Sequence, residues 1–380
     1  MQVFEMKIKD VKVAVVTTGP WPTPVPKDFG WTLVKVITDE DIEGYGETFA
    51  TPDVMESFKT IKQRLIGEDP TNLNRIQHLA AGKFRSGIEI ACWDILGKKL
   101  DVPLYKLFGG EFRRKIRMYA DSGGPYGWGL GSSDPEDFAE RARQVLKRGF
   151  DAMKIDLDAP EHQKIGFNRS LSNAEIDLMM EQVRAVRDVI GGDMPLAIDC
   201  HGKYSVNDAI KLGKRLEEFD IWWLEDPIPG RNFDALLEVK RTVRVPISAG
   251  EQLTSRYEFR SLIEKQAASI IGPDSRSTGG LLEFKAVMDM ADLYYIPCGP
   301  HNMTSPIGTV ATAHVCAATK NFMALEHHFQ DFPWWENLIK EPKPLIDHGY
   351  ISLPEKPGIG IEINEEEVLK HIKFGEDFFS

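Results

Sequence analysis

Three carboxylates follow one another at equal intervals, each at the end of a short apolar run. Asp199 ends PLAID, Glu225 ends IWWLE and Glu251 follows VPISAG, and both intervals (199 to 225 and 225 to 251) are 26 residues long. One βα unit of a parallel barrel has about this length, and barrel active sites lie at the carboxyl ends of the strands. The spacing predicts three neighbouring strands that bring their carboxylates together at one end.

Converging carboxylates repel each other unless a cation lies between them. Oxygen ligands of this kind suit a hard divalent ion, and Mg²⁺ in particular. The alternative is three solvated loop acids, which are common in a chain with a net charge of −12. The equal spacing and the strand context favour the metal site, so we expect one Mg²⁺ per subunit held by Asp199, Glu225 and Glu251.

Two histidines are candidates for proton transfer. His201 lies two residues beyond Asp199, so an extended backbone would place both side chains on one face, where an imidazole is a natural general acid or base. His301 follows the seventh apolar run, and Asp274 ends the sixth. Asp274 could therefore accept a hydrogen bond from His301, fixing its tautomer and raising its basicity. The alternatives are a surface position for His201 and a helix cap for Asp274.

Further polar residues occur at strand ends. Lys154 and Asp156 share a face of the second strand because side chains alternate, and could supply a cation and an acceptor for a polyol. The alternative is a strand-end lysine and a turn-former. Glu326 ends the eighth run and is either a site residue or a charged strand end. Of the adjacent His327 and His328, at most one is expected to be functional.

A loop rich in Pro and Gly, TTGPWPTPVPKDFG, separates the first two predicted strands. Loops of this length in a compact domain are usually functional or disordered. Trp21 and Lys27 from this loop, together with Arg85, are candidate substrate-binding residues.

Eight short apolar runs alternate with helical segments after residue 113: IRMYA, AMKIDL, PLAID, IWWLE, VPISAG, ASIIGPD, LYYIPCG and FMALEHH. This alternation predicts right-handed βαβ units and a parallel sheet, and eight units predict a closed, modified (β/α)8 TIM-like barrel over residues 114–332. Residues 1–113 read as an N-terminal α+β capping domain. The proline-rich residues 333–380 are expected to pack back on it, giving an α/β protein overall.

Composition excludes several classes of protein. The net charge of −12 argues against nucleic-acid binding, because no basic surplus is present to neutralise phosphates. The four cysteines form no CxxC pair, so neither a zinc site nor a disulfide framework is expected. With no signal-peptide pattern and no apolar run of membrane-spanning length, we expect a cytoplasmic protein without a membrane partner.

With these residues in place, the chain resembles the enolase superfamily, mandelate racemase branch. The resemblance rests on the capping module, the SGIEIACWDILGK segment before the barrel and the ordered D…E…E…H series. It implies abstraction of the proton α to a carboxylate, with Mg²⁺ stabilising the enediolate. It further implies that Asp199, Glu225 and Glu251 bind the metal, that Asp274 and His301 form the base, and that the protein is a homo-oligomer.

Two details refine the resemblance. Racemases and lactonising enzymes of this branch usually carry a Lys-x-Lys pair on the second strand, but here Asp156 replaces the second lysine. His201 resembles the galactonate dehydratase pattern, in which this histidine protonates the departing 3-hydroxyl. The resemblance thus implies dehydration of a small-molecule acid sugar, an aldonate such as gluconate or galactonate, to a 2-keto-3-deoxy acid. A hydrogen bond from a protonated Glu326 would add stabilisation.

Three alternatives stay open. An epimerase would use His301 on one face of the substrate and Lys154 on the other. A dehydratase for a diacid sugar would use the same site on a different substrate. A non-enzymatic barrel with a structural or regulatory role would bind Mg²⁺ without turnover.

Overall fold

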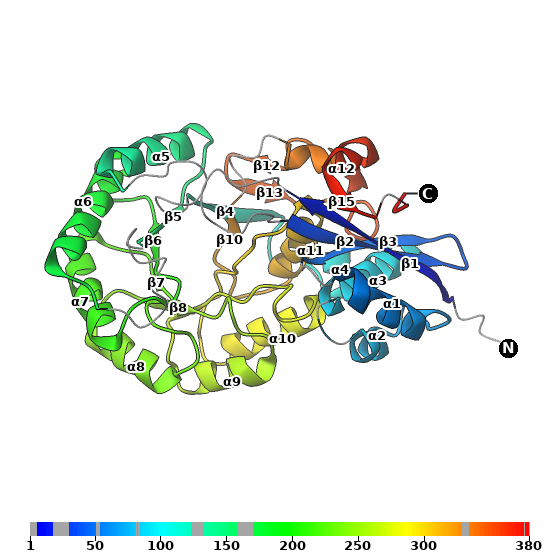
Figure 1. Cartoon of the computed structure of the whole chain (residues 1–380), viewed down its shortest axis with the longest axis horizontal. Helices are drawn as coiled ribbons and strands as arrows, with labels where there is room; N and C mark the ends of the chain where they lie inside the picture. Colours follow the sequence, from blue (N-terminus) through cyan, green and yellow to red (C-terminus); the bar gives the residue numbers. More distant parts are fainter. Residues whose placement is uncertain are drawn as a thin grey trace.

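An antiparallel sheet forms the N-terminal part of the molecule. Its strands β1 (Ile8–Thr17), β2 (Gly30–Thr38) and β3 (Glu43–Phe49) pair in chain order. Helices cover one face of the sheet: α1 (Val54–Leu65), α2 (Leu73–Leu79) and α3 (Arg85–Lys99). Their apolar side chains share a core with alternate residues of β1, so the predicted α+β capping domain is confirmed (Figure 1).

The computed structural model describes residues 6–17, 30–50, 54–80, 82, 84–122, 133–157, 170–328, 334–375 and 377–379, with the backbone alone for 54–57. Trp21 and Lys27 lie outside the described residues. Among the described helices, none is both long and apolar enough to cross a membrane.

Parallel strands form a ring beside the capping domain (Figure 1). These strands are β4 (Lys115–Asp121), β5 (Met153–Asp156), β6 (Leu196–Asp199), β7 (Leu224–Glu225), β8 (Ile247–Ala249), β9 (Ile270–Ile271) and β10 (Leu325–His327). Each strand from β4 to β8 pairs with the next, and β10 pairs with β4. Cys298 bridges Ile271 on one side and Phe322 on the other, which closes the ring. The predicted modified barrel is therefore confirmed.

The prediction of a seventh strand over the whole run LYYIPCG is wrong. Of the run LYYIPCG, Cys298 alone forms bridges, and Leu293 directly follows helix α10 (Leu281–Asp292). Pro297 and Pro300 flank the bridge and have no N–H to donate, which prevents a longer ladder.

Helices surround the strands on the outside of the ring (Figure 1). They are α5 (Pro135–Lys147), α6 (Asn173–Ile190), α7 (Val206–Leu216), α8 (Phe233–Thr242), α9 (Arg256–Glu264), α10 and α11 (Pro306–Ala317), and the short α4 (Leu104–Leu107) precedes them. Local sequence sets their ends. Ser172 and Glu175 form a capping box at the start of α6, and Gly191 (φ 76°) ends it.

The C-terminal segment contacts both parts of the molecule. Its elements are β11 (Ile339–Glu341), β12 (Ile346–Asp347), β13 (Tyr350–Ser352), β14 (Glu362–Ile363), α12 (Glu365–His371) and β15 (Ile372–Phe374). Strand β15 adds to the capping sheet beside β1, whereas β13 pairs with β4 of the barrel. The predicted domain boundaries at residues 113/114 and 332/333 stay a prediction.

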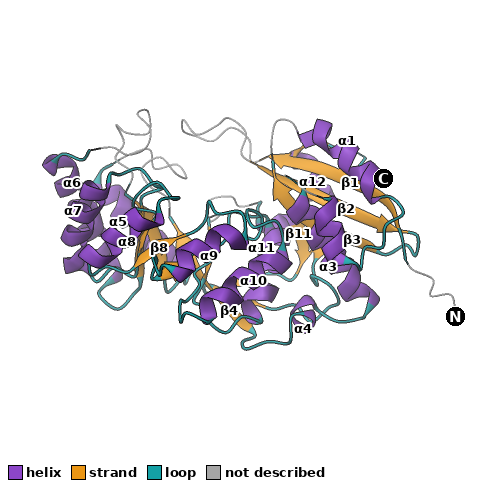
Figure 2. Ribbon diagram, turned by 90° about the horizontal axis from the view of Figure 1, so that it is seen from below, coloured by secondary structure: helices purple, strands orange, loops and turns teal. Residues whose placement is uncertain are grey.

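A buried carboxylate joins the capping domain to the barrel. Helices α10 and α11 lie between the barrel strands and the capping sheet (Figure 2). Glu89 of α3 accepts hydrogen bonds from the N–H groups of Leu281 (2.8 Å) and Leu282 (3.0 Å) at the start of α10, and from Trp93 Nε1 (2.9 Å). Gly280 (φ 126°) allows this close approach, since a Cβ there would meet the carboxylate.

We expect Glu89→Ala to lower the free energy of unfolding by about 3 kcal/mol, because it leaves several buried N–H groups without an acceptor. Urea unfolding followed by tryptophan fluorescence measures this change. Glu362→Ala is the control, because Glu362 forms an exposed ion pair with Lys340 and its loss should have little effect. Equal destabilisation by the two substitutions would contradict the role assigned to Glu89.

Candidate metal centre and proton-transfer site

The structure brings the three evenly spaced carboxylates together. Asp199 ends β6, Glu225 ends β7 and Glu251 lies two residues beyond β8. Carboxylate oxygens of the three residues lie within 4.8 Å of one another. The parallel pairing of Asp199 with Glu225 fixes the first two at the same level of the barrel. These three residues, called the carboxylate cluster below, could hold a metal ion.

A buried lysine adjoins two members of the carboxylate cluster. Lys154 Nζ lies 2.9 Å from Asp199 Oδ2, 3.2 Å from Glu225 Oε1 and 2.5 Å from Glu326 Oε1. From the sequence, Lys154 was assigned to a substrate polyol, and its pairing with the carboxylates was not predicted. Lys154 does share its face of β5 with Asp156, as predicted, but it points into the barrel among carboxylates and is almost fully buried.

The negative charge of the carboxylate cluster is only partly compensated by neighbouring cations. Burial raises the pKa of Glu225 to about 8, with further raising by the neighbouring carboxylates and lowering by Lys154. For Asp199, burial opposes ionisation, but His201 and Lys154 outweigh it and lower the pKa to about 2. One lysine therefore does not compensate all three carboxylates. An all-oxygen donor set with uncompensated negative charge fits a hard divalent cation.

His301 and Asp274 form the predicted pair. His301 Nδ1 lies 2.7 Å from Asp274 Oδ2, and its Nε2 lies 3.6 Å from Glu251 Oε2. With the proton on Nδ1 directed to Asp274, Nε2 faces the carboxylate cluster as a proton acceptor. Burial lowers the pKa of His301, but Glu326, Asp274 and Glu251 outweigh burial and raise it to about 9.

The environment of Glu326 opposes the donor role expected for it. Its carboxylate accepts the N–H of Asn302 (2.9 Å) and lies beside both Lys154 and His328 Nε2, the latter at 3.2 Å. Burial raises the pKa of Glu326, but these cations lower it well below its usual value. Glu326 is thus held as a carboxylate anion, whereas donation of a hydrogen bond would need the protonated form.

His201 lies beside Asp199 as predicted, but the two residues are not on one face of an extended strand. The strand ends at Asp199, and His201 has a left-handed backbone (φ 47°). Its backbone N–H donates to Asp199 Oδ1 (2.8 Å), and its ring Nδ1 lies 3.7 Å from the same oxygen. Ligand atoms of Asp156, Asp199 and His201 lie within 4.8 Å of one another. A turn rather than strand alternation therefore brings His201 to the cluster.

Arg85, the remaining candidate substrate-binding residue, lies away from the carboxylate cluster. Arg85 begins α3, where its side chain packs over Gly279 and lies 3.4 Å from Gln77 Oε1. These described contacts are at the junction of the capping domain with α10 and do not bring Arg85 to the carboxylate cluster.

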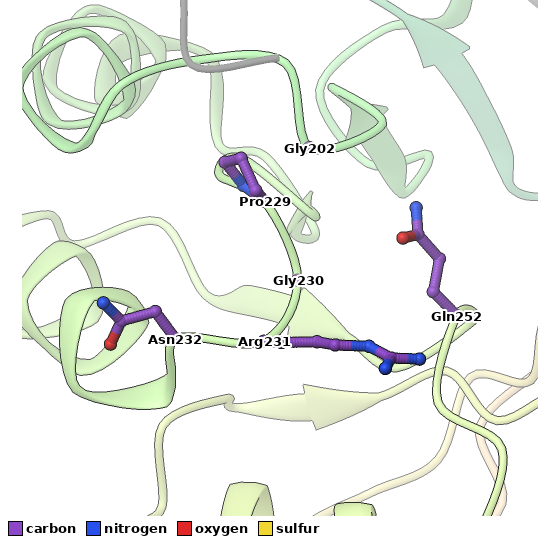
Figure 3. Close-up of a pocket in the computed structure, with 6 residues that line it drawn as sticks. All are labelled: Gly202, Pro229, Gly230, Arg231, Asn232 and Gln252. Carbon is purple, nitrogen blue, oxygen red and sulfur yellow. The ribbon is translucent and has the colours of Figure 1, made fainter.

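A hollow is lined by the loops that follow β6, β7 and β8 (Figure 3). Its volume of about 450 Å³ is sufficient for a small-molecule ligand. Gly202 directly follows His201, and Gln252 directly follows Glu251, so two of the lining loops also carry site residues. Arg231 lines the same hollow and forms an ion pair with Glu258 at 3.4 Å.

Two more residues lie beside the site: Asp121, which was not considered from the sequence, and His328, one of the two adjacent histidines of which at most one was expected to be functional. Asp121 ends β4 and lies 3.5 Å from Lys154 Nζ and 2.9 Å from His328 Nε2. Burial lowers the pKa of His328, but Asp121 and Glu326 outweigh it and raise the value to about 10. The rule that selected the other acids, a carboxylate at the carboxyl end of a strand, would also have found Asp121.

The fold and site define a barrel enzyme architecture with an acidic centre of metal-binding type and a histidine–aspartate pair. The model described as "Enolase C-terminal domain-like" matches residues 137–368. The "Mandelate racemase / muconate lactonizing enzyme, N-terminal domain" model matches residues 15–109. The chain therefore belongs to the mandelate racemase/muconate lactonizing enzyme family of the enolase superfamily, and this resemblance is confirmed.

Relatives within the family are named as dehydratases. The chain is 39% identical to D-xylonate dehydratase of Haloferax volcanii, with 98% of this chain and 92% of the relative covered. It is 30% identical to D-gluconate/D-galactonate dehydratase of Picrophilus torridus, covering 96% and 92%. A mandelate racemase/muconate lactonizing enzyme-like protein from Rubrobacter xylanophilus has a similar crystal structure, with a TM-score of 0.85, 36% identity and coverage of 98% and 99%.

Proposed function

We propose that the protein is an Mg²⁺-dependent dehydratase that converts an aldonic acid into its 2-keto-3-deoxy acid. The observation that carries the proposal is the arrangement of two histidines around the carboxylate cluster. His301 Nε2 lies 3.6 Å from Glu251, and His201 Nδ1 lies 3.7 Å from Asp199. A base and an acid thus adjoin different members of one candidate metal site. The relatives named as acid-sugar dehydratases, which are hydro-lyases, support the same conclusion.

The reaction needs one proton removed and one delivered. A divalent cation held by the carboxylate cluster would bind the substrate carboxylate and stabilise the enediolate charge. His301 Nε2 accepts the C2 proton while Asp274 holds Nδ1–H in place. His201 donates a proton to the 3-hydroxyl, the C3–O bond breaks and water leaves. The resulting enol gains a proton at C3 and becomes the 2-keto acid.

A panel of aldonates assayed with Mg²⁺ for 2-keto-3-deoxy products tests the proposal. The five-carbon xylonate is the first substrate to test, because the relative with 39% identity is named for it, and gluconate and galactonate follow. Deuterium exchange at C2 without keto-acid formation would instead indicate an epimerase. Mg²⁺ binding without turnover across the panel would indicate a non-catalytic barrel. That the protein forms a homo-oligomer stays a prediction, which analytical ultracentrifugation would test.

His201→Asn is expected to lower the rate of water elimination by about 10²-fold or more, because hydroxide leaves badly without a general acid. Mg²⁺ binding and C2 deuterium exchange should persist, since His301 is unchanged. His348→Asn is a matched control: His348 is exposed and has nearly the same left-handed backbone (φ 48° against 47°), which asparagine tolerates. Wild-type elimination by His201→Asn on the best substrate would remove the general-acid role.

A further inference from the structure

We propose that Arg276 is a positioning residue that connects Glu47 of the capping domain to the Asp274–His301 pair. The inference rests on the proposed function in one respect, the role of His301 as the base. Arg276 is almost fully buried, and its guanidinium lies between Glu47 of the capping domain and Asp274 of the barrel. It therefore acts through Asp274 and is not itself a catalytic residue.

On the barrel side, Arg276 fixes the orientation of Asp274. The two oxygens of Asp274 have different partners. Oδ1 accepts the backbone N–H groups of Arg276 (2.6 Å) and Ser277 (3.1 Å). Oδ2 lies 2.7 Å from His301 Nδ1 and 3.4 Å from Arg276 Nη2. The guanidinium and the imidazole thus share one oxygen, so a shift of Arg276 changes the geometry at His301.

On the other side, the capping sheet holds the guanidinium. Its centre lies 4.2 Å from the ring centroid of Phe49, and its Nη1 lies 3.8 Å from Glu47 Oε1. Both partners belong to β3, two residues apart on the same face of the strand. A stacked and ion-paired arginine in a buried position has little freedom, because its planar group is restrained by the ring and by the charge together.

Glu47 also holds the segment that carries His301. Its carboxylate accepts the backbone N–H of Ser305 at 3.1 and 3.0 Å and also binds the Ser305 hydroxyl, at the N-terminus of α11. Trp31 of β2 donates from Nε1 to Met303 O (3.1 Å) in the same segment. The capping sheet therefore contacts both members of the pair, His301 through its segment and Asp274 through Arg276.

This arrangement gives the capping domain a part in proton transfer. A displacement of about 1 Å of a reacting group can cost about 10²-fold in rate. Loss of Arg276 would remove the guanidinium from Asp274 Oδ2, so that only the backbone N–H groups at Oδ1 and His301 itself would orient the carboxylate. Because metal binding and substrate binding use other groups, the loss should appear mainly in kcat.

The test compares Arg276→Met with Arg276→Lys. We expect Arg276→Met to lower kcat by about 10²-fold with little change in KM, and to lower C2 deuterium exchange in parallel. Arg276→Lys keeps the charge beside Asp274 and should recover part of kcat. Arg256→Met is the matched control, because Arg256 also pairs with a carboxylate of the barrel, Glu283 at 2.5 Å, yet does not adjoin Asp274. Wild-type kcat in folded Arg276→Met overturns the proposal.

A second measurement does not depend on turnover. Protein labelled with ¹⁵N-histidine should show the His301 Nδ1 proton bonded to Asp274, assigned by its loss in His301→Asn. The signal should shift or broaden in Arg276→Met and persist in Arg256→Met. An unchanged signal in Arg276→Met overturns the positioning role. A changed signal supports it even if no aldonate is turned over, so that failure of the proposed function and failure of this inference are distinguishable.

Glu47→Gln tests the connection to the capping domain. Glutamine keeps an acceptor for Ser305 but removes the charge facing Arg276. If Arg276 acts through this contact, the double variant Glu47→Gln/Arg276→Met should lose less kcat than the product of the two single effects. Fully independent effects would overturn the link to Glu47.

Discussion

Removal of divalent cations with a chelator is expected to abolish turnover, and added Mg²⁺ should restore it. The α-proton of a carboxylate is very weakly acidic, and an imidazole is too weak a base to remove it unaided. Lys154 supplies positive charge to Asp199 and Glu225, but it does not compensate the whole carboxylate cluster. Glu225→Gln should weaken Mg²⁺ binding by at least the ~100-fold that loss of an outer partner of a metal site can cause.

Titration calorimetry with Mg²⁺, alongside the activity assay, separates loss of metal from loss of fold. Glu225→Gln keeps an amide acceptor near Lys154 and so should preserve local packing. Glu362→Gln, an exposed position, is the control and should bind Mg²⁺ as the wild type does. Full activity in excess chelator would remove the metal from the mechanism.

Periodic features of the chain were predictable. The positions of Asp199, Glu225 and Glu251 follow from the repeat of βα units, because parallel strands bring their carboxyl ends to one edge. The pairing of His301 with Asp274 follows from the same repeat, since their strands are neighbours. Where the repeat is interrupted, prediction failed. The seventh strand reduces to a bridge at Cys298, and a turn places His201 beside Asp199.

Contacts between distant segments could not be predicted. Glu47, Arg276 and His301 come from the capping domain and two different barrel loops, and no sequence period connects them. The ionised state of Glu326 depends on Lys154, from a strand remote in the sequence, as well as on His328, which lies two residues along the chain. Strand periodicity specifies which face a side chain occupies, whereas its charge state depends on neighbours that the fold alone brings together.

His301→Asn is expected to lose both water elimination and C2 deuterium exchange, by about 10⁴-fold. The asparagine amide can donate a hydrogen bond to Asp274, but it offers no basic nitrogen toward the carboxylate cluster, where Nε2 of His301 lies 3.6 Å from Glu251. Asp274→Asn should lose much of each activity, because the amide no longer favours the tautomer with Nε2 free. The base must be neutral to accept a proton, and the neighbouring carboxylates raise the pKa of His301. Wild-type activity should therefore rise with pH as His301 loses its proton.

C2 proton exchange measured by NMR in deuterated buffer, with His348→Asn as control, tests the role of His301. A His301→Asn enzyme that still exchanges the C2 proton would transfer the role of base to Lys154 or to another residue.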